Sequence, residues 1–195
     1  MATLKARQYF PKEMGLIKHK GIRKIVAIVL ERVPAGFYTK PASSTGKYHP
    51  KSSLGHEGLI RHVRLVALYA RFICEVKMFS LSEIQEDLLI AAALLHDSVK
   101  YGLEDGPHTA KDHAQIAATF LEDSIILYDE HIAHEMESPE QYEYIKKALR
   151  GLLLSHHGQW SNPLPEPSIM LERLFHLADY LASRKEFDSD EPATA

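Results

Sequence analysis

The sequence AAALLHDSVK, residues 91–100, carries His96 and Asp97 at the end of an apolar run. An ionised carboxylate that is taken out of water needs a compensating partner, so a buried aspartate usually pairs with a cation or binds a metal ion. Candidate co-ligands recur along the chain: His62, His113, His156, His157 and Asp179. We therefore interpret Asp97 as a ligand of a metal ion.

The hydrophobic pattern on both sides of this run is helical. Apolar residues recur at spacings of three and four, and no segment alternates as a strand would. Ser82 begins a sequence typical of a helix start, so a helix should run from there to His96. The other predicted helices cover residues 21–33, 54–78, 142–157 and 169–184, together with one that begins at Thr109 or Asp112. The sequence therefore predicts an all-α fold.

Finer expectations follow from the same pattern. His62 should point inward, because it lies on the apolar stripe of the helix 54–78. Residues 37–53 favour turns, and residues 129–140 should be charged and irregular. The last helix should bury five apolar residues, namely Leu171, Leu174, Leu177, Ala178 and Leu181.

Composition indicates one domain with distinct ends. A chain of 195 residues with 45% hydrophobic content can form one substantial core. We expect a basic N-terminal segment and helix packed on the domain (1–34), the domain itself (35–185) and an acidic flexible tail (186–195). The formal net charge of -3 argues against binding duplex nucleic acid through bulk electrostatics. The basic N-terminal stretch could meet a polyanion, but a solvated face is the simpler interpretation.

The single cysteine, Cys74, excludes an intramolecular disulfide and suits a reducing compartment. It lies in an apolar helical pattern, so we expect it to be a core residue. The sequence shows no signal peptide and no apolar run of membrane-spanning length. We expect a soluble, cytoplasmic protein with no membrane partner.

Adjacent ligands suggest two ions. Successive helical residues diverge by about 100°, so His96 and Asp97 cannot share one face, and the same holds for His156 and His157. A carboxylate has two oxygens and can bridge two ions, whereas a neutral imidazole offers one free nitrogen. Mixed imidazole and carboxylate ligation suits iron, manganese, cobalt, nickel or zinc, and the lack of thiols argues against a structural zinc cage.

Three segments resemble the HD-domain superfamily of metal-dependent phosphohydrolases. GLIRH (58–62), LLHDSVK (94–100) and LSHHG (154–158) look like the HD modules of bacterial 3′-to-5′ exoribonucleases and of cyclic-dinucleotide phosphodiesterases. PASSTGKYH (41–49) is similar to a lead-in of uncharacterised HD hydrolases. The resemblance spans residues 37–184, and Val99 departs from it where many relatives have glycine. It implies an all-α helical bundle with the metal site in its centre.

The resemblance also implies two metal sites. His62, His96, Asp97 and Asp179 would hold one ion, and Asp97, His113, His156 and His157 would hold the second. In such a site two divalent ions about 3.5–4 Å apart supply hydroxide near neutral pH, which attacks phosphorus in line.

Several residues are predicted to contact the substrate. Lys100 is placed to pair with a phosphate, although it could also be a solvated helix-end lysine. Trp160 could stack on a base or simply pack. The remaining candidates are Lys47, His49, Gln159 and Arg184. The expected substrate is a phosphate-containing small molecule or a short single-stranded nucleic acid.

Alternatives remain at several points. His108 competes with His113, and one residue of the pair His156 and His157 could bind substrate instead. His131 and His134 could form a small separate metal site, although a solvated charged segment fits better. At the level of function, the ligand pattern also fits a dinuclear-iron oxygenase of the same superfamily. A non-catalytic nucleotide-binding domain is the third reading.

Overall fold

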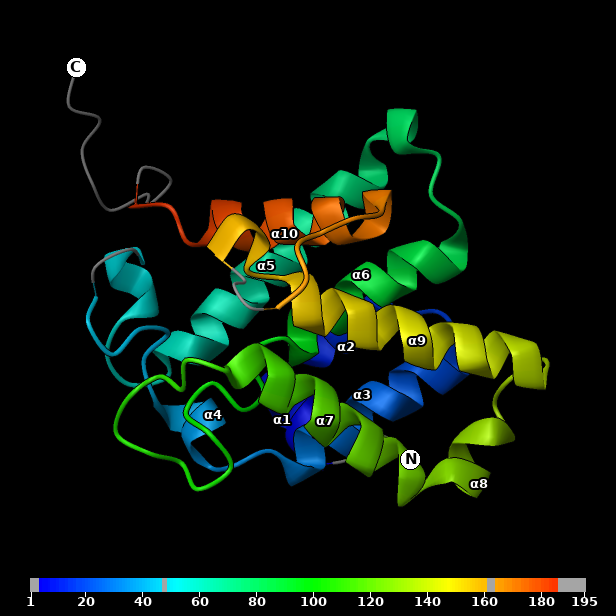
Figure 1. The fold of residues 1–195 in the computed structure, drawn as a ribbon, viewed down its shortest axis with the longest axis horizontal. Helices are drawn as coiled ribbons and strands as arrows, with labels where there is room; N and C mark the ends of the chain where they lie inside the picture. Colours follow the sequence, from blue (N-terminus) through cyan, green and yellow to red (C-terminus); the bar gives the residue numbers. More distant parts are fainter. Residues whose placement is uncertain (1–3, 47–48, 161–163, 186–195) are drawn as a thin grey trace.

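The computed structural model describes residues 4–46, 49–160 and 164–185, and these residues form helices, turns and loops without a strand (Figure 1). The predicted all-α fold is confirmed. The helices are α1 (Leu4–Tyr9), α2 (Pro11–Leu16), α3 (Lys20–Arg32), α4 (Gly36–Thr39), α5 (Gly58–Glu75), α6 (Glu83–Leu95), α7 (His113–Ile126), α8 (Asp129–Ala133), α9 (Pro139–Ser155) and α10 (Met170–Ala182). Short 3-10 turns lie at Lys51–Ser53, Lys77–Phe79 and Gly158–Trp160. Lys47 and the tail 186–195 lie outside the described residues.

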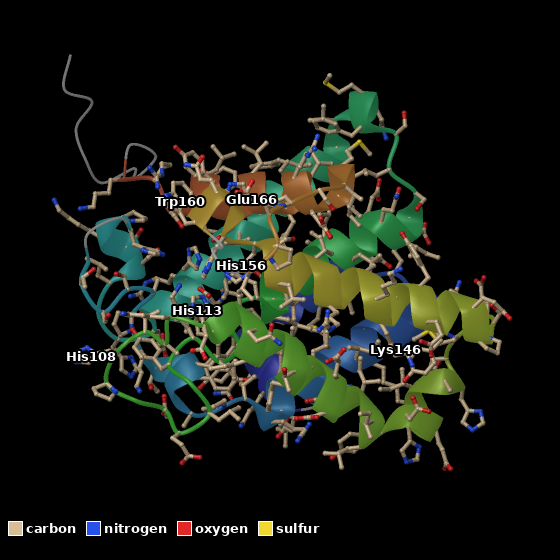
Figure 2. All side chains as sticks on the ribbon, in the orientation of Figure 1. His108, His113, Lys146, His156, Trp160 and Glu166 are labelled. Atoms are coloured by element: carbon tan, nitrogen blue, oxygen red, sulfur yellow. The ribbon has the colours of Figure 1, made fainter. Side chains whose placement is uncertain are left out.

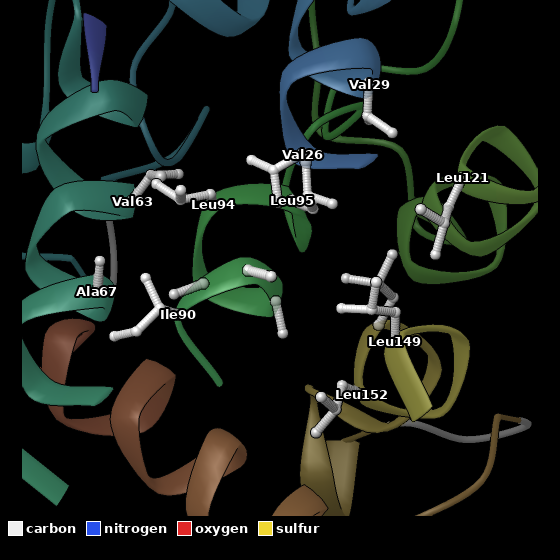
Figure 3. Packing of buried hydrophobic residues seen from close by; sticks show 14 of the residues in the cluster. Val26, Val29, Val63, Ala67, Ile90, Leu94, Leu95, Leu121, Leu149 and Leu152 are labelled. Carbon is white, nitrogen blue, oxygen red and sulfur yellow. The ribbon is translucent and has the colours of Figure 1, made fainter. Parts of the chain in front are cut away.

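Helix α6 is the centre of the bundle. Every residue from Asp87 to Lys100 is buried, because α6 packs against α3, α5, α9 and α10. Figure 3 shows Ile90, Leu94 and Leu95 of α6 surrounded by apolar side chains of its neighbours. The predicted start of α6 is confirmed: the Ser82 hydroxyl accepts from the Gln85 backbone N–H, and the Gln85 side chain accepts from the Ser82 N–H.

The N-terminal helices pack on this bundle. Helix α3 contacts α6 and α7, and α2 contacts α6. The buried carboxylate of Asp87 accepts hydrogen bonds from the backbone N–H groups of Lys18 (3.1 Å) and His19 (2.6 Å). The carboxylate of Asp87 thus holds the residues just before α3 in place, because it satisfies backbone donors next to the helix start.

The helix predicted over residues 54–78 is shorter than expected. It begins only at Gly58, because Gly55 (φ 72°) and Glu57 (φ 59°) have left-handed backbone conformations that end the preceding turn. It ends at Glu75, and Val76 is extended. His62 nevertheless points inward as expected, with 1% of its surface exposed.

Other local predictions were wrong. Residues 129–140 are not irregular throughout: α8 lies within them, and α9 starts at Pro139, where the Ser138 hydroxyl caps the helix. Leu177 on α10 is 41% exposed, and Phe175 is buried instead. Cys74 is only half-buried. Among the described residues no helix is both long enough and apolar enough to span a membrane.

Candidate metal centre

The structure brings the seven predicted ligands together from five elements. His62 lies in the second turn of α5, His113 begins α7, and Asp179 lies on α10. His96 and His156 are the C-cap residues of α6 and α9, followed by Asp97 and His157. Helix ends therefore supply most of the site. Figure 2 shows His113 and His156 close together in the middle of the fold.

One group consists of His62, His96 and Asp179. The Nε2 atoms of His62 and His96 are 3.4 Å apart. Asp179 Oδ1 lies 3.2 Å from the Nε2 atom of His62 and 3.6 Å from that of His96. Three ligand atoms of suitable type thus face a common point.

The second group consists of His113, His156 and His157. Its ligand atoms all lie within 4.8 Å of one another, and the Nε2 atoms of His113 and His157 are 3.0 Å apart. Burial differs within the group, because His157 is only partly buried whereas His156 is 1% exposed. The cluster therefore has one ligand on the side of the solvent.

Asp97 lies between the two groups. Its Oδ2 atom is 3.6 Å from His62 Nε2 and 3.4 Å from His96 Nε2. Its Oδ1 atom is 3.1 Å from His113 Nε2 and 4.0 Å from His156 Nε2. Each oxygen of one carboxylate thus faces a different histidine group, which is the arrangement that a bridging ligand requires.

Backbone carbonyls orient three of the imidazoles. The Nδ1 atoms of His96, His113 and His156 lie 3.0, 2.8 and 2.6 Å from carbonyl oxygens three residues earlier in the chain. A proton on Nδ1 donates to that carbonyl and leaves Nε2 as a lone pair directed into the centre. Asp97 Oδ1 and His156 Nε2 are buried and have no hydrogen-bond partner in the described chain. Orphaned buried acceptors of this kind fit a bound cation.

The electrostatics of the centre favour metal-binding protonation states. Burial lowers the pKa of His157 to about 4 and that of His156 well below its usual range. Burial alone would raise the pKa of Asp97, but Lys100 and His96 outweigh burial and hold this pKa well below its usual range. His96 differs, because burial lowers its pKa but Asp97 and Asp179 together raise it by more. Near pH 7 these shifts favour the carboxylate of Asp97 and the neutral imidazoles of His156 and His157, the forms that bind metals, whereas His96 must give up a proton to bind one.

Lys100 is not a solvated helix-end lysine. Only 8% of it is exposed, and its Nζ atom lies 2.5 Å from Asp97 Oδ2. The spacing of three residues brings the ammonium back over Asp97. Lys100 and Asp97 both border a cavity, and the contact of Lys100 with a phosphate stays a prediction.

A cavity of about 620 Å³ opens beside the centre. The predicted residues His49, Lys100, Trp160 and Arg184 line it, whereas Gln159 is exposed and does not. Further residues that line the cavity were not predicted from the sequence, among them Thr109, Lys111, His176 and Tyr180. His176 lies three residues before Asp179 and four before Tyr180, a helical spacing that could have indicated His176. Nothing in the local sequence indicated Thr109 or Lys111.

The alternative histidines lie elsewhere. His108 is exposed, and Figure 2 shows it away from His113, at the tip of a loop. His131 and His134 are also exposed. None of these three histidines belongs to a group of potential metal ligands in the described part of the chain.

Comparison with protein families matches residues 59–184 to the model of the HD domain. The match covers more than half of the chain, so the protein belongs to the HD domain family, an all-α family of generally metal-dependent phosphohydrolases. HD domains bind divalent metals, and this property agrees with the two groups of potential ligands found in the structure. Comparisons with curated proteins and with solved structures gave no match.

Proposed function

We propose that this protein is a metal-dependent phosphohydrolase that cleaves a phosphodiester or phosphomonoester of a nucleotide, cyclic dinucleotide or short oligonucleotide. The observation that carries the proposal is the position of Asp97, whose two oxygens face two separate histidine groups at the edge of the cavity. His62, His96, Asp97 and Asp179 would hold one divalent ion. Asp97, His113, His156 and His157 would hold the other.

Divalent ions bound there would lower the pKa of a water molecule and offset charge on the phosphate oxygens. Hydrolysis adds the water oxygen to phosphorus and releases the ester oxygen as an alcohol, which takes up a proton. The chain itself supplies the ligands and a cationic surface. Lys100, Lys111 and Arg184 line the cavity, so they attract an anionic substrate and orient its phosphate.

The test is a screen of phosphate esters with the full-length protein and added manganese, iron, cobalt or nickel. We expect phosphate or nucleotide release that does not need dioxygen, so the screen is run under both aerobic and anaerobic conditions. Turnover that requires dioxygen would support an oxygenase and contradict the proposal. Absence of turnover by protein that carries its metals would favour a binding domain.

Two variants distinguish a specific effect at the metal centre from a general effect of substitution on the fold. Asp97→Ala should lose metal and turnover. Asp123→Ala, which removes an exposed carboxylate on α7, should retain both. Equal activity of the two variants would contradict the proposal.

A further inference from the structure

Two aromatic rings and an arginine form one rim of the cavity. Trp160 closes the turn after His157, and Tyr180 and Arg184 come from α10 and the residues after it. The rings of Trp160 and Tyr180 are parallel within 4°, with centroids 6.0 Å apart. The guanidinium carbon of Arg184 lies 4.2 Å from the centre of the Tyr180 ring. This rim is thus a layered set of flat groups.

Two groups of this rim still have surface or hydrogen-bonding atoms without a partner among the described residues. Trp160 is 57% exposed, although it borders a cavity. The Nε atom of Arg184 is buried without a hydrogen-bond partner among the described residues. The exposed surface of the indole can therefore stack with a flat ring, and Arg184 carries an N–H donor without a partner next to it.

Other residues around the cavity have a different character. Thr109 and Lys111 line it on the loop that leads into α7, and the predicted metal ligands His113, His156 and Asp179 line it as well. Figure 2 shows Trp160 on the α10 side of the centre and His113 on the α7 side. A molecule that fills the cavity would place a flat group on Trp160 and anionic groups at the ligands and lysines.

We propose that Trp160, Tyr180 and Arg184 form a nucleobase-binding subsite, so that the substrate is a nucleotide rather than a base-free phosphate ester. The inference rests on the proposed function, because the phosphate is assigned to the metal centre. Nucleobases stack on aromatic rings with little dependence on base identity, and arginine adds cation–π and hydrogen-bonding contacts. The subsite therefore selects for a base without selecting one base strongly.

Trp160 is the single tryptophan of the chain, so its fluorescence reports on this subsite alone. The metal-loaded protein is titrated with AMP and, separately, with ribose 5-phosphate, which lacks the base. We expect AMP to quench the emission of Trp160 in a saturable way and ribose 5-phosphate to leave it unchanged. Binding of AMP in calorimetry without a change in emission would overturn the proposal, and so would failure of AMP to bind.

Variants provide the second readout, which is the ratio of the Kd for ribose 5-phosphate to the Kd for AMP. Trp160→Ala should lower this ratio by roughly ten-fold or more, since stacking of one base contributes that much binding. Trp160→Phe should retain most of it. Tyr144→Ala is the matched control, because Tyr144 is an exposed ring on α9 that does not line the cavity.

An unchanged ratio in Trp160→Ala, or the same reduction in Tyr144→Ala, would overturn the subsite. Failure of the proposed function is recognised independently. In that case the wild-type protein with bound metal releases no product from any ester in the screen, whatever the state of Trp160.

Discussion

Gly158 follows the histidine pair, and replacing it with alanine should damage the second ligand group. Its φ of +58° is a left-handed conformation, which costs an L-residue roughly 1–2 kcal/mol. An added Cβ would lie 2.3 Å from Cε1 and Nε2 of His176, so the His176 ring must move. That ring is held by its Nδ1 atom, 2.7 Å from the carbonyl oxygen of His156. Losing this bond adds about 1 kcal/mol.

The total loss for Gly158→Ala is therefore about 2–3 kcal/mol, or a fall in Tm of roughly 4–12 °C for a chain of this size. Thermal unfolding followed by circular dichroism, in the presence of a chelator, measures this loss without the contribution of bound metal. Gly102→Ala is the matched control. Gly102 also has a positive φ (75°), but its added Cβ would meet nothing within 4 Å.

Gly158→Ala should exceed Gly102→Ala by about 1 kcal/mol or more, and the excess should vanish when His176 is also replaced with alanine. An equal loss of stability for the two glycine variants in the otherwise wild-type chain would contradict the predicted clash with His176. So would an excess that persists without His176.

Three further predictions concern the centre and the core helix. Asp97→Asn should lose both metal binding and turnover, and it should destabilise the metal-free protein by about 3–5 kcal/mol because Lys100 loses its buried partner; chelator-treated protein of unchanged Tm would contradict the ion pair. Ser82→Ala should cost about 1 kcal/mol through loss of the helix cap, with kcat unchanged; a change in kcat would show that α6 transmits the damage to the site. Chelation of the wild-type protein should lower Tm and re-addition of metal should restore it, because each occupied site stabilises the folded state by about 2.7 kcal/mol at a free metal concentration 100 times its Kd; a Tm that is insensitive to metal would argue against a bound ion.

The sequence predicted the core helix for a physical reason that is local. Burial of α6 on all sides needs an uninterrupted apolar run, so His96 and Asp97 at its end stand out. The full set of seven candidate ligands was implied by the resemblance to the HD-domain superfamily, and the structure brings these residues together.

Other features depend on tertiary placement. The positive φ of Glu57 delays the start of α5, and no residue preference predicts it, because Glu57 is not glycine. Lys111 lines the cavity only because the loop before α7 brings it there. The ion pair between Lys100 and Asp97 requires the turn after α6, which apolar periodicity does not describe.

Asp97 lies between two proposed metal sites, so the number of metal ions bound per chain is the most direct test of its role as a bridging ligand. The full-length protein is loaded with Mn²⁺ at neutral pH, freed of unbound ions by dialysis, and subjected to elemental analysis together with an independent protein determination. We expect two ions per chain. One ion or none per folded chain would contradict it.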